Sequence, residues 1–342
     1  MTELMTKPRV AQVVLLKVEA MFKANIMKSG LYNWHRALDG EFIFYKDVKG
    51  RLSEYDILLV IADQSTLSHA QISRMREELG DSSDTIIVAS MDYAAEMWQE
   101  SAPQIGLMQH ELSKADFVFA SEQCNQEYLS ALLGRDVPVL PHPADVANIK
   151  KFRKAHYDRE RSIFSVMHKW ETNWLASYMA GRDHEGTLHK AVFMFKPQRA
   201  DMVSFFDEIL PPHPADKFPE WCDWMSKQWI YLDPYNMIHT FGRTPVECAA
   251  LGLCCVGSEV VHSIRTLYPE LVTPAGHVNK QRQLIKQLLN DNDFYSHCSE
   301  QAITRVEDYS YANRRREFME MIGYADPISK DRRHEELSRS AS

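Results

Sequence analysis

Short, continuously apolar runs alternate with segments of helical periodicity along the first 140 residues. The apolar runs, which indicate buried strands, lie at residues 10–16, 42–45, 57–62, 85–89, 117–120 and 138–140. The helical patterns between them lie at residues 31–38, 70–79, 104–112 and 125–133. Continuous apolar strands separated by helices predict a parallel sheet that is covered on both faces. The first half is therefore expected to form a Rossmann-like domain.

The second half repeats this alternation after a charged stretch. Apolar runs that predict strands lie at residues 162–167, 190–195, 229–232 and 254–257. Residues 278–289 have an amphipathic helical pattern, with the aliphatic side chains on one side. Residues 205–229 are rich in aromatic residues, with a proline cluster, and we expect an irregular insertion there. Most of its rings are expected in the core, and a wall that stacks on a base or sugar is the alternative.

Charge rises and apolar content falls at residues 146–161, which marks the expected domain boundary. We predict two Rossmann-like domains, at residues 1–150 and 151–308, followed by a helix at 309–328. The final segment, 329–342, is rich in Lys, Arg, Glu and Ser, a composition typical of a disordered tail. Ligands of open α/β sheets bind beyond the carboxyl ends of the strands, so two facing sheets would share one crevice.

Residues 240–252 join a glycine turn to the start of a helix. Thr244 suits the N-cap, Pro245 the first helical position, and Gly252 the C-terminal stop. Unpaired backbone N–H groups and the positive end of the helix dipole favour an anion at such a start. Arg243 adds a planar fork of donors beside them. The junction therefore predicts a phosphate-binding site.

The same junction resembles a family signature. Phe241-Gly242 and the segment 247–252 are similar to the donor-site motif of GT-B glycosyltransferases, especially the retaining group that includes sucrose and glycogen synthases. The resemblance implies that Glu247 binds the ribose of a nucleotide sugar. The family's first acidic residue, near the transferred sugar, is replaced by His239. The resemblance also implies a GT-B architecture, in which two Rossmann-like domains face each other across a cleft and a C-terminal helix crosses back to the first.

Arg243 is the residue expected to stabilise the departing diphosphate, with the backbone of Gly242 and Thr244 beside the phosphates. GT-B enzymes generally meet this developing negative charge with cationic side chains and a helix terminus, so no metal is expected. His239, at the sugar position of the motif, is a second catalytic candidate. The simpler interpretation of Arg243 is a surface salt bridge.

Other donor-site positions depart from the family pattern. Where the family has a second Arg and a Lys, this chain has His168 and Asn173. Lys169 and Lys196 are the candidates to supply the missing charge. The family's glycine-rich first loop, which approaches both substrates, is represented by Gly30.

Two acidic residues carry alternative interpretations. Asp92 follows a predicted strand and would suit a general base toward an acceptor hydroxyl in an inverting mechanism. It would equally suit a plain helix N-cap. Glu247 lies three residues after Thr244, so the pair also fits a capping box in which the Glu reaches back to the Thr backbone.

Composition limits the classes of partner. The chain has 342 residues with 45% hydrophobic and 25% charged residues and a net charge of −8, so bulk attraction to nucleic acid or anionic lipid is not expected. A basic stretch at residues 150–161 is either a solvated linker or a rim for an acidic acceptor. No apolar run is long enough to span a membrane and no secretory signal is visible, and the six cysteines form no Cys-x-x-Cys pair. We therefore expect a reduced, cytoplasmic protein without stable membrane association.

These observations predict a metal-independent glycosyltransferase that moves a hexose or pentose from a nucleotide sugar, with a UDP-sugar as the expected donor. A retaining mechanism is favoured over an inverting one. The acceptor would be a hydroxyl, and a modified base in DNA, which would have to be flipped out of the helix, stays open. The alternatives are an epimerase or phosphorylase of the same fold, or an inactive module that binds sugar nucleotides.

Overall fold

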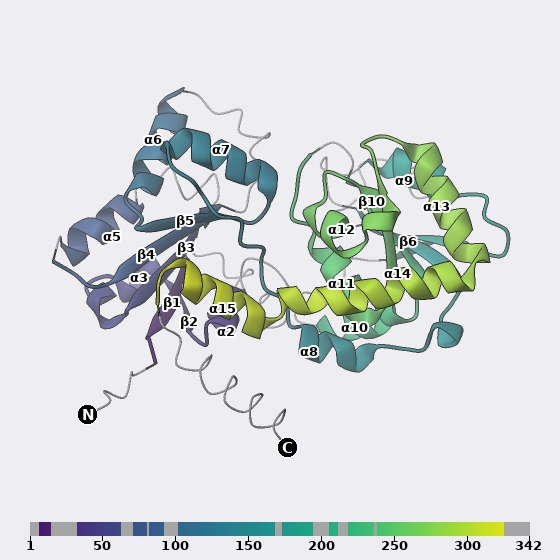
Figure 1. Ribbon diagram of the computed structural model, residues 1–342, viewed down its shortest axis with the longest axis horizontal. Helices are drawn as coiled ribbons and strands as arrows, with labels where there is room; N and C mark the ends of the chain where they lie inside the picture. The colour runs from purple at the N-terminus through teal and green to yellow at the C-terminus, as the bar shows by residue number, and fades with distance from the viewer. Residues whose placement is uncertain are drawn as a thin grey trace, which may run out of the picture.

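Two α/β domains lie side by side in the computed structural model (Figure 1). The structure describes residues 7–14, 33–62, 71–80, 82–91, 102–167, 173–193, 205–210, 218–235 and 238–324. Each domain is built around a parallel sheet with helices between its strands, which confirms the predicted α/β class.

The first sheet has five parallel strands in the order β2-β1-β3-β4-β5. The strands are β1 Val10–Val14, β2 Glu41–Phe44, β3 Ile57–Ala62, β4 Ile86–Met91 and β5 Phe117–Ala120. The described α-helices of this domain are α2 Trp34–Ala37, α3 Tyr45–Val48, α5 Gln71–Leu79, α6 Ala102–Ser113 and α7 Gln123–Leu133. The chain leaves β1 toward β2 on one side and returns to β3 on the other, so the strand order reverses between β1 and β3. The run predicted as a strand at residues 138–140 forms only an isolated bridge, between Ala120 and Val139.

The second sheet has six parallel strands in the order β11-β10-β9-β6-β7-β8. Its strands are β6 Ser162–Met167, β7 Leu188–Phe193, β8 Glu208–Leu210, β9 Ile230–Leu232, β10 Cys254–Ser258 and β11 Val272–Thr273. The chain passes from β6 outward to β8 and then returns to β9 on the other side of β6. The strand order therefore reverses between β6 and β9, and open sheets bind ligands at such a point.

Helices cover both faces of the second sheet. They are α9 Trp174–Gly181, α10 Phe218–Ser226, α11 Arg243–Leu251, α12 His262–Leu267, α13 Val278–Asn290 and α14 Asn292–Arg305. The β6-to-β7 and β9-to-β10 crossovers run in opposite directions, so right-handed connections place α9 and α11 on opposite faces. Helix α13 packs beside α9, whereas α10 and α12 flank α11. The N-termini of α9 and α11 both follow carboxyl ends of strands at the reversal point.

Part of the predicted insertion at residues 205–229 is regular, so that prediction is wrong for the part that the structure describes. It contains β8 and α10. Phe218, Trp221, Cys222 and Met225 recur at helical spacing and are all buried, which is why α10 forms. Core packing accounts for these rings, as expected.

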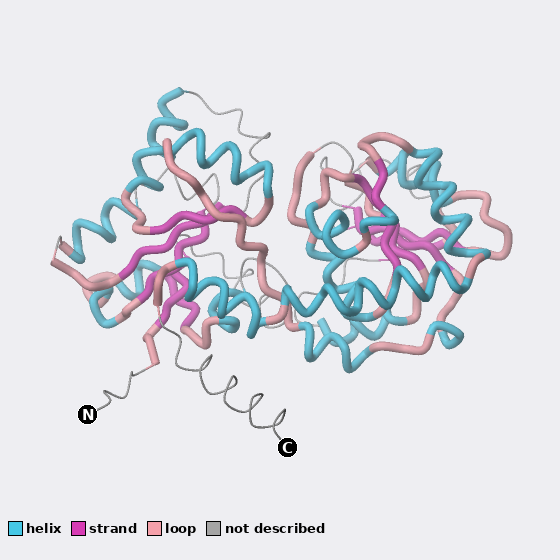
Figure 2. Tube along the Cα trace, viewed as in Figure 1, coloured by secondary structure: helices cyan, strands magenta, loops and turns pink. Residues whose placement is uncertain are grey.

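The chain crosses between the domains twice, before α8 Val146–Ile149 and before α15 Tyr311–Met321, and the two connections lie together (Figure 2). They are joined by a parallel bridge between Ala144 and Ser310, and the Ala144 N–H donates to the Tyr309 carbonyl at 2.8 Å. Helix α15 then packs on the first domain, where Phe318 and Met319 share an apolar cluster with β1 and α2 residues.

None of the helices in the described part of the chain combines the length and apolar character that crossing a bilayer requires. All six cysteines are free thiols, and all but Cys124 are buried.

Candidate functional site

Two loops meet at the reversal point of the second sheet. The loop after β9 begins at Asp233 and ends at Gly242, where α11 starts. The segment that follows β6 re-enters the described chain at Asn173, whose backbone N–H donates to the Pro234 carbonyl at 3.0 Å. The start of α9 is therefore joined to the loop that leads from β9 to α11.

The start of α11 lies two positions before the predicted start. Gly242, not Thr244, is the N-cap, with φ 77° and ψ 86°, and Arg243 is the first helical residue. The prediction of Thr244 as N-cap and Pro245 as first residue is wrong because the glycine turn itself ends the loop. Gly252 ends the helix in the left-handed region, with φ 74°, as predicted.

The turn at Gly242 is fixed by side chains that pack against it. Its carbonyl accepts the Ser263 hydroxyl at 2.6 Å, and a Cβ at this position would overlap the Val261 side chain. The loop before it is also pinned, because the Thr240 N–H donates to the Val260 carbonyl at 3.0 Å and the Thr240 carbonyl accepts from His262 at 2.9 Å. The first turn of α11 is thus preorganised by backbone contacts.

The first turn of α11 carries a cation and no acidic residue. The first N–H groups of an α-helix have no partner inside the helix, and they lie at the positive end of its dipole. No acidic residue stands in the first turn of α11, and its N-cap makes no side-chain hydrogen bond. Arg243 adds a cation that is 40% exposed. A cation is unfavourable at this end unless an anion joins it, so the arrangement suits a phosphate.

Glu247 lies one turn farther along α11 and is almost fully buried, at 3% exposure. Its Oε2 accepts a hydrogen bond from the Trp221 indole N–H at 3.2 Å, and its Oε1 lies 4.0 Å from the Arg243 Nε. The capping-box interpretation is wrong, since Thr244 is not the N-cap. Within the described residues, the salt-bridge interpretation of Arg243 has one supporting contact, the 4.0 Å ion pair with Glu247.

Asp233 is a candidate that the sequence interpretation missed. It follows the last residue of β9, is 3% exposed, and its Oδ1 accepts the Tyr235 N–H at 2.8 Å. Burial raises the pKa of this carboxyl to about 7, although hydrogen bonds from Tyr235 and Tyr231 oppose the shift. The sequence feature that could have identified Asp233 is an acidic residue directly after an apolar strand.

The sugar-position residue His239 is half-buried in the same loop. Next to it, Phe241 contacts the linker residue His142, with ring centroids 5.1 Å apart. The His142 Nδ1 in turn accepts the indole N–H of Trp34, from α2 of the first domain, at 3.1 Å. The loop before α11 is therefore in contact with the first domain through one buried histidine.

The basic stretch at residues 150–161 has structural partners. Arg153 donates to the Ala250 carbonyl at 3.0 Å, and Arg159 donates to the carbonyls of Leu251 and Gly252 at 3.0 and 2.7 Å. These arginines stabilise the negative end of the α11 dipole. The stretch is not a free basic rim, and that alternative interpretation loses its support at Arg153 and Arg159.

Four predicted site residues, Gly30, Asp92, Lys169 and Lys196, lie outside the described residues. The structure brings together Gly242, Arg243, Thr244 and Glu247 on α11, with His239 in the loop before them.

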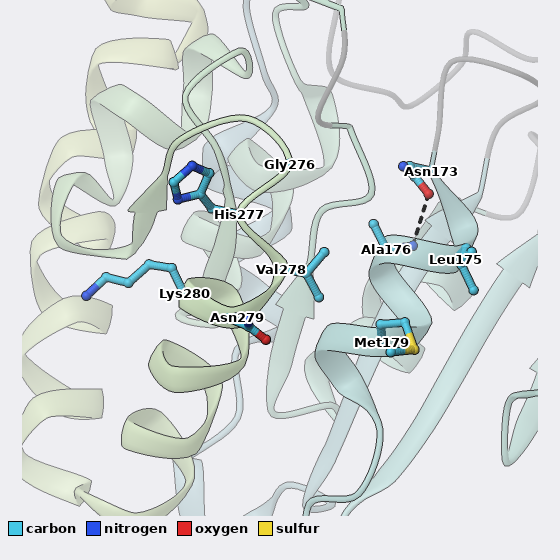
Figure 3. A pocket seen from close by; sticks show the side chains of 9 residues that line it. All are labelled: Asn173, Leu175, Ala176, Met179, Gly276, His277, Val278, Asn279 and Lys280. Atoms are coloured by element: carbon cyan, nitrogen blue, oxygen red, sulfur yellow. Dashed lines mark hydrogen bonds between the residues drawn. The ribbon is translucent and has the colours of Figure 1, made fainter.

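A separate pocket of about 510 Å³ opens between the start of α9 and the segment before α13 (Figure 3). Leu175, Met179 and Val278 give it an apolar lining. Arg243 and Glu247 do not line it, and it touches the loop junction only at Asn173. The Asn173 side chain caps α9 by accepting from the Ala176 N–H at 3.0 Å.

Solved structures with a similar architecture include a protein in complex with UDP-glucose, a sucrose-phosphate synthase and an alpha-glucosyltransferase. HepE of Anabaena in complex with UDP-glucose superposes with a TM-score of 0.69 at 11% identity, covering 92% of this chain and 99% of that one. Sucrose-phosphate synthase from Thermosynechococcus elongatus gives 0.64 at 12%, covering 92% and 98%. An alpha-glucosyltransferase in complex with UDP and a 13-mer DNA containing an HMU base gives 0.60 at 10%, covering 90% and 96%.

No protein-family model matches this sequence, and no curated protein matches it either. At these low sequence identities, the structural similarity establishes which fold the chain has. The chain has the GT-B fold, as the sequence motif implied.

Proposed function

We propose that this protein is a glycosyltransferase that uses a nucleotide-sugar donor bound at the start of α11. The observation that carries the proposal is the combination, within two turns of one helix, of N–H groups that have no partner inside the helix, Arg243 and the buried carboxylate of Glu247. These are complementary to the two polar ends of a nucleoside diphosphate, its phosphates and its ribose hydroxyls. Their place at the strand-order reversal supports the same ligand.

The roles follow from charge. The Arg243 guanidinium and the N–H groups of Gly242 and Thr244 hold the diphosphate and stabilise the charge that grows on it as the sugar leaves. Glu247 accepts hydrogen bonds from the ribose hydroxyls, and charge-assisted bonds of this kind are strong. His239, half-buried at the start of the turn, faces the sugar end of the donor. Lys169 and Lys196 are the candidates for a second phosphate cation.

UDP is the proposed nucleotide, because structures of this fold carry UDP or UDP-glucose. The transferred group is a hexose or pentose. We propose a retaining reaction without a metal: the bond between the sugar and the diphosphate breaks, and the acceptor oxygen attacks from the same face. The leaving phosphate takes the acceptor proton. Six free thiols suit a reducing cytoplasm.

The acceptor side belongs to the first domain, where Gly30 and Asp92 are the proposed contacts. A hydroxyl on a modified DNA base is one acceptor to test, since one structural neighbour holds such DNA. If DNA binds, its affinity must fall steeply with salt. Affinity that is independent of salt would exclude the DNA acceptor.

Isothermal titration of UDP into wild-type protein and Glu247→Gln tests the donor site. Gln keeps the volume and one acceptor oxygen but removes the charge, so we expect UDP to bind about tenfold more weakly. Glu259→Gln, on the loop after β10, is the matched control and should bind UDP normally. Equal affinity in wild type and Glu247→Gln, or no binding of UDP or any other nucleoside diphosphate, would refute the proposed site.

A binding module without transferase activity is the second candidate. It is favoured by Asn173, which stands where the family has a phosphate-binding Lys and whose side chain is committed to capping α9. Incubation of UDP-glucose with the protein separates the alternatives. UDP release with an acceptor indicates transfer, sugar inversion without an acceptor indicates an epimerase, and binding without turnover indicates a module.

A further inference from the structure

Trp221 connects the aromatic side chains of the core to Glu247. It lies on α10, is 6% exposed, and donates its indole N–H to the Glu247 Oε2 at 3.2 Å. Its ring stacks on Trp224, with centroids 5.1 Å apart and an interplanar angle of 16°. Trp224 in turn meets Phe164 of β6 edge to face at 5.3 Å. The indole therefore has one orientation, fixed by the sheet beneath it.

The hydrogen bond from Trp221 orients the carboxylate of Glu247. Oε2 points to α10, and Oε1 is the oxygen nearer to Arg243 and the start of α11. A second negative charge beside this carboxylate is disfavoured, because burial and then the negative charges of Glu247 and Asp145 raise the pKa of the neighbouring Cys222 thiol. A neutral N–H donor can hold such a carboxylate without cancelling its charge. A carboxylate offers about four acceptor positions, so Glu247 can accept from Trp221 and from further donors at the same time.

We propose that Trp221 is a positioning residue for the nucleotide ribose. By holding Oε2, it turns the carboxylate of Glu247 toward the ribose hydroxyls of a donor whose diphosphate lies at Arg243. This inference rests on the proposed function. It assigns to α10, which the sequence patterns did not predict, a share in selecting ribonucleotides over nucleotides that lack the ribose hydroxyls. An acceptor fixed before binding costs no reorganisation when the ligand arrives.

The competing explanation is that Trp221 merely satisfies a buried carboxylate. Both explanations predict a loss of stability in Trp221→Phe, so stability cannot separate them. Only positioning predicts a loss of discrimination between UDP and 2′,3′-dideoxy-UDP, because that ratio cancels every contact to the base and the phosphates.

The test is isothermal titration of both nucleotides into wild type, Trp221→Phe, Trp224→Phe and Glu247→Gln. Wild type should prefer UDP by about tenfold or more, since a site built for hydroxyl groups rejects a ligand without them. In Trp221→Phe the preference should fall by about fivefold, with the affinity for dideoxy-UDP unchanged. Trp224→Phe alters the same stack without touching Glu247 and should keep the full preference.

An unchanged preference in Trp221→Phe, or an equal loss of affinity for both nucleotides, would overturn the inference. If Glu247→Gln also keeps the preference, the ribose assignment of the proposed function fails, and the inference fails with it. If Trp221→Phe does not fold, benzothienylalanine at position 221 replaces it, because sulfur then stands in place of the N–H in a ring of nearly the same shape. The same loss of preference is expected.

Discussion

The two ends of α11 are treated in opposite ways by the surrounding chain. At the C-terminal end, Arg153 and Arg159 donate to the carbonyls of Ala250, Leu251 and Gly252. At the N-terminal end, the first turn carries Arg243 and no acid. The fold itself neutralises the C-terminal end, whereas at the N-terminal end Arg243 has the 4.0 Å contact to Glu247 and remains 40% exposed. The difference assigns the first end to stability, and it supports the proposal that the second end binds an anion.

The largest expected effect on stability concerns Asp233, the first residue of the loop that leads to the N-terminal end of α11. Its pKa is about 7 in the folded protein and 3.8 without burial, so the folded state binds more protons between these values. Stability from this group is full at low pH and is lost as pH rises through 7. Asp233→Asn keeps the acceptor for Tyr235 and removes the charge. Relative to wild type, it should gain up to about 4 kcal/mol in unfolding free energy between pH 4 and pH 8.

Urea denaturation of both proteins at the two pH values measures this change. Burial also lowers the pKa of His189 to about 4, so this residue costs stability as pH falls below 6.5. It does not affect the comparison of the two proteins. That histidine is present in both proteins and cancels in the difference. A difference that does not vary with pH would show that Asp233 titrates normally.

The second largest effect is expected when the arginine contacts at the C-terminal end of α11 are removed. Arg159→Met should destabilise the protein by about 3 kcal/mol, because its buried guanidinium also donates to the Tyr295 hydroxyl and several acceptors would lose their donor. Arg161→Met, at an exposed neighbouring arginine, should cost no more than about 0.5 kcal/mol. Chemical denaturation gives both values. Normal UDP affinity is expected in Arg159→Met, and a selective loss of UDP binding would contradict a purely structural role.

The smallest effect on stability comes from the other end. Arg243→Gln removes a cation from the positive end of the dipole, so stability should rise by about 0.5 kcal/mol. UDP should bind about tenfold more weakly, and uridine, which has no phosphate, should be unaffected. Thermal denaturation and titration on the same sample measure both quantities. Destabilisation with unchanged UDP affinity would make Arg243 an ordinary structural residue.

Local patterns were sufficient for much of the fold. The predicted bounds of β3, β5 and β6 agree with the structure because each strand is a continuous apolar run between polar residues. The predicted helix start was displaced by two residues, because Thr244 has the side chain of an N-cap whereas Gly242 has the backbone freedom. Part of the aromatic segment 205–229 was misjudged, since its helical spacing at α10 was overlooked beside the prolines.

The site depended on contacts that are distant in sequence. Arg159 meets Gly252 across 93 positions and Arg153 meets Ala250 across 97, so a basic run could not be distinguished from a free surface. Trp221 lies 26 positions before the Glu247 that it contacts. Glu247 itself was predicted because its distance from Phe241-Gly242 along the chain is a local feature. The motif identified the carboxylate, and only the fold shows what holds it.

A crystal structure of the protein with UDP tests the central claim most directly. The account predicts phosphate oxygens within about 3 Å of the Thr244 N–H and the Arg243 guanidinium, and ribose hydroxyls at the same distance from Glu247. UDP bound elsewhere, for instance in the apolar pocket between α9 and α13, would contradict it. So would UDP at α11 with its ribose turned away from Glu247.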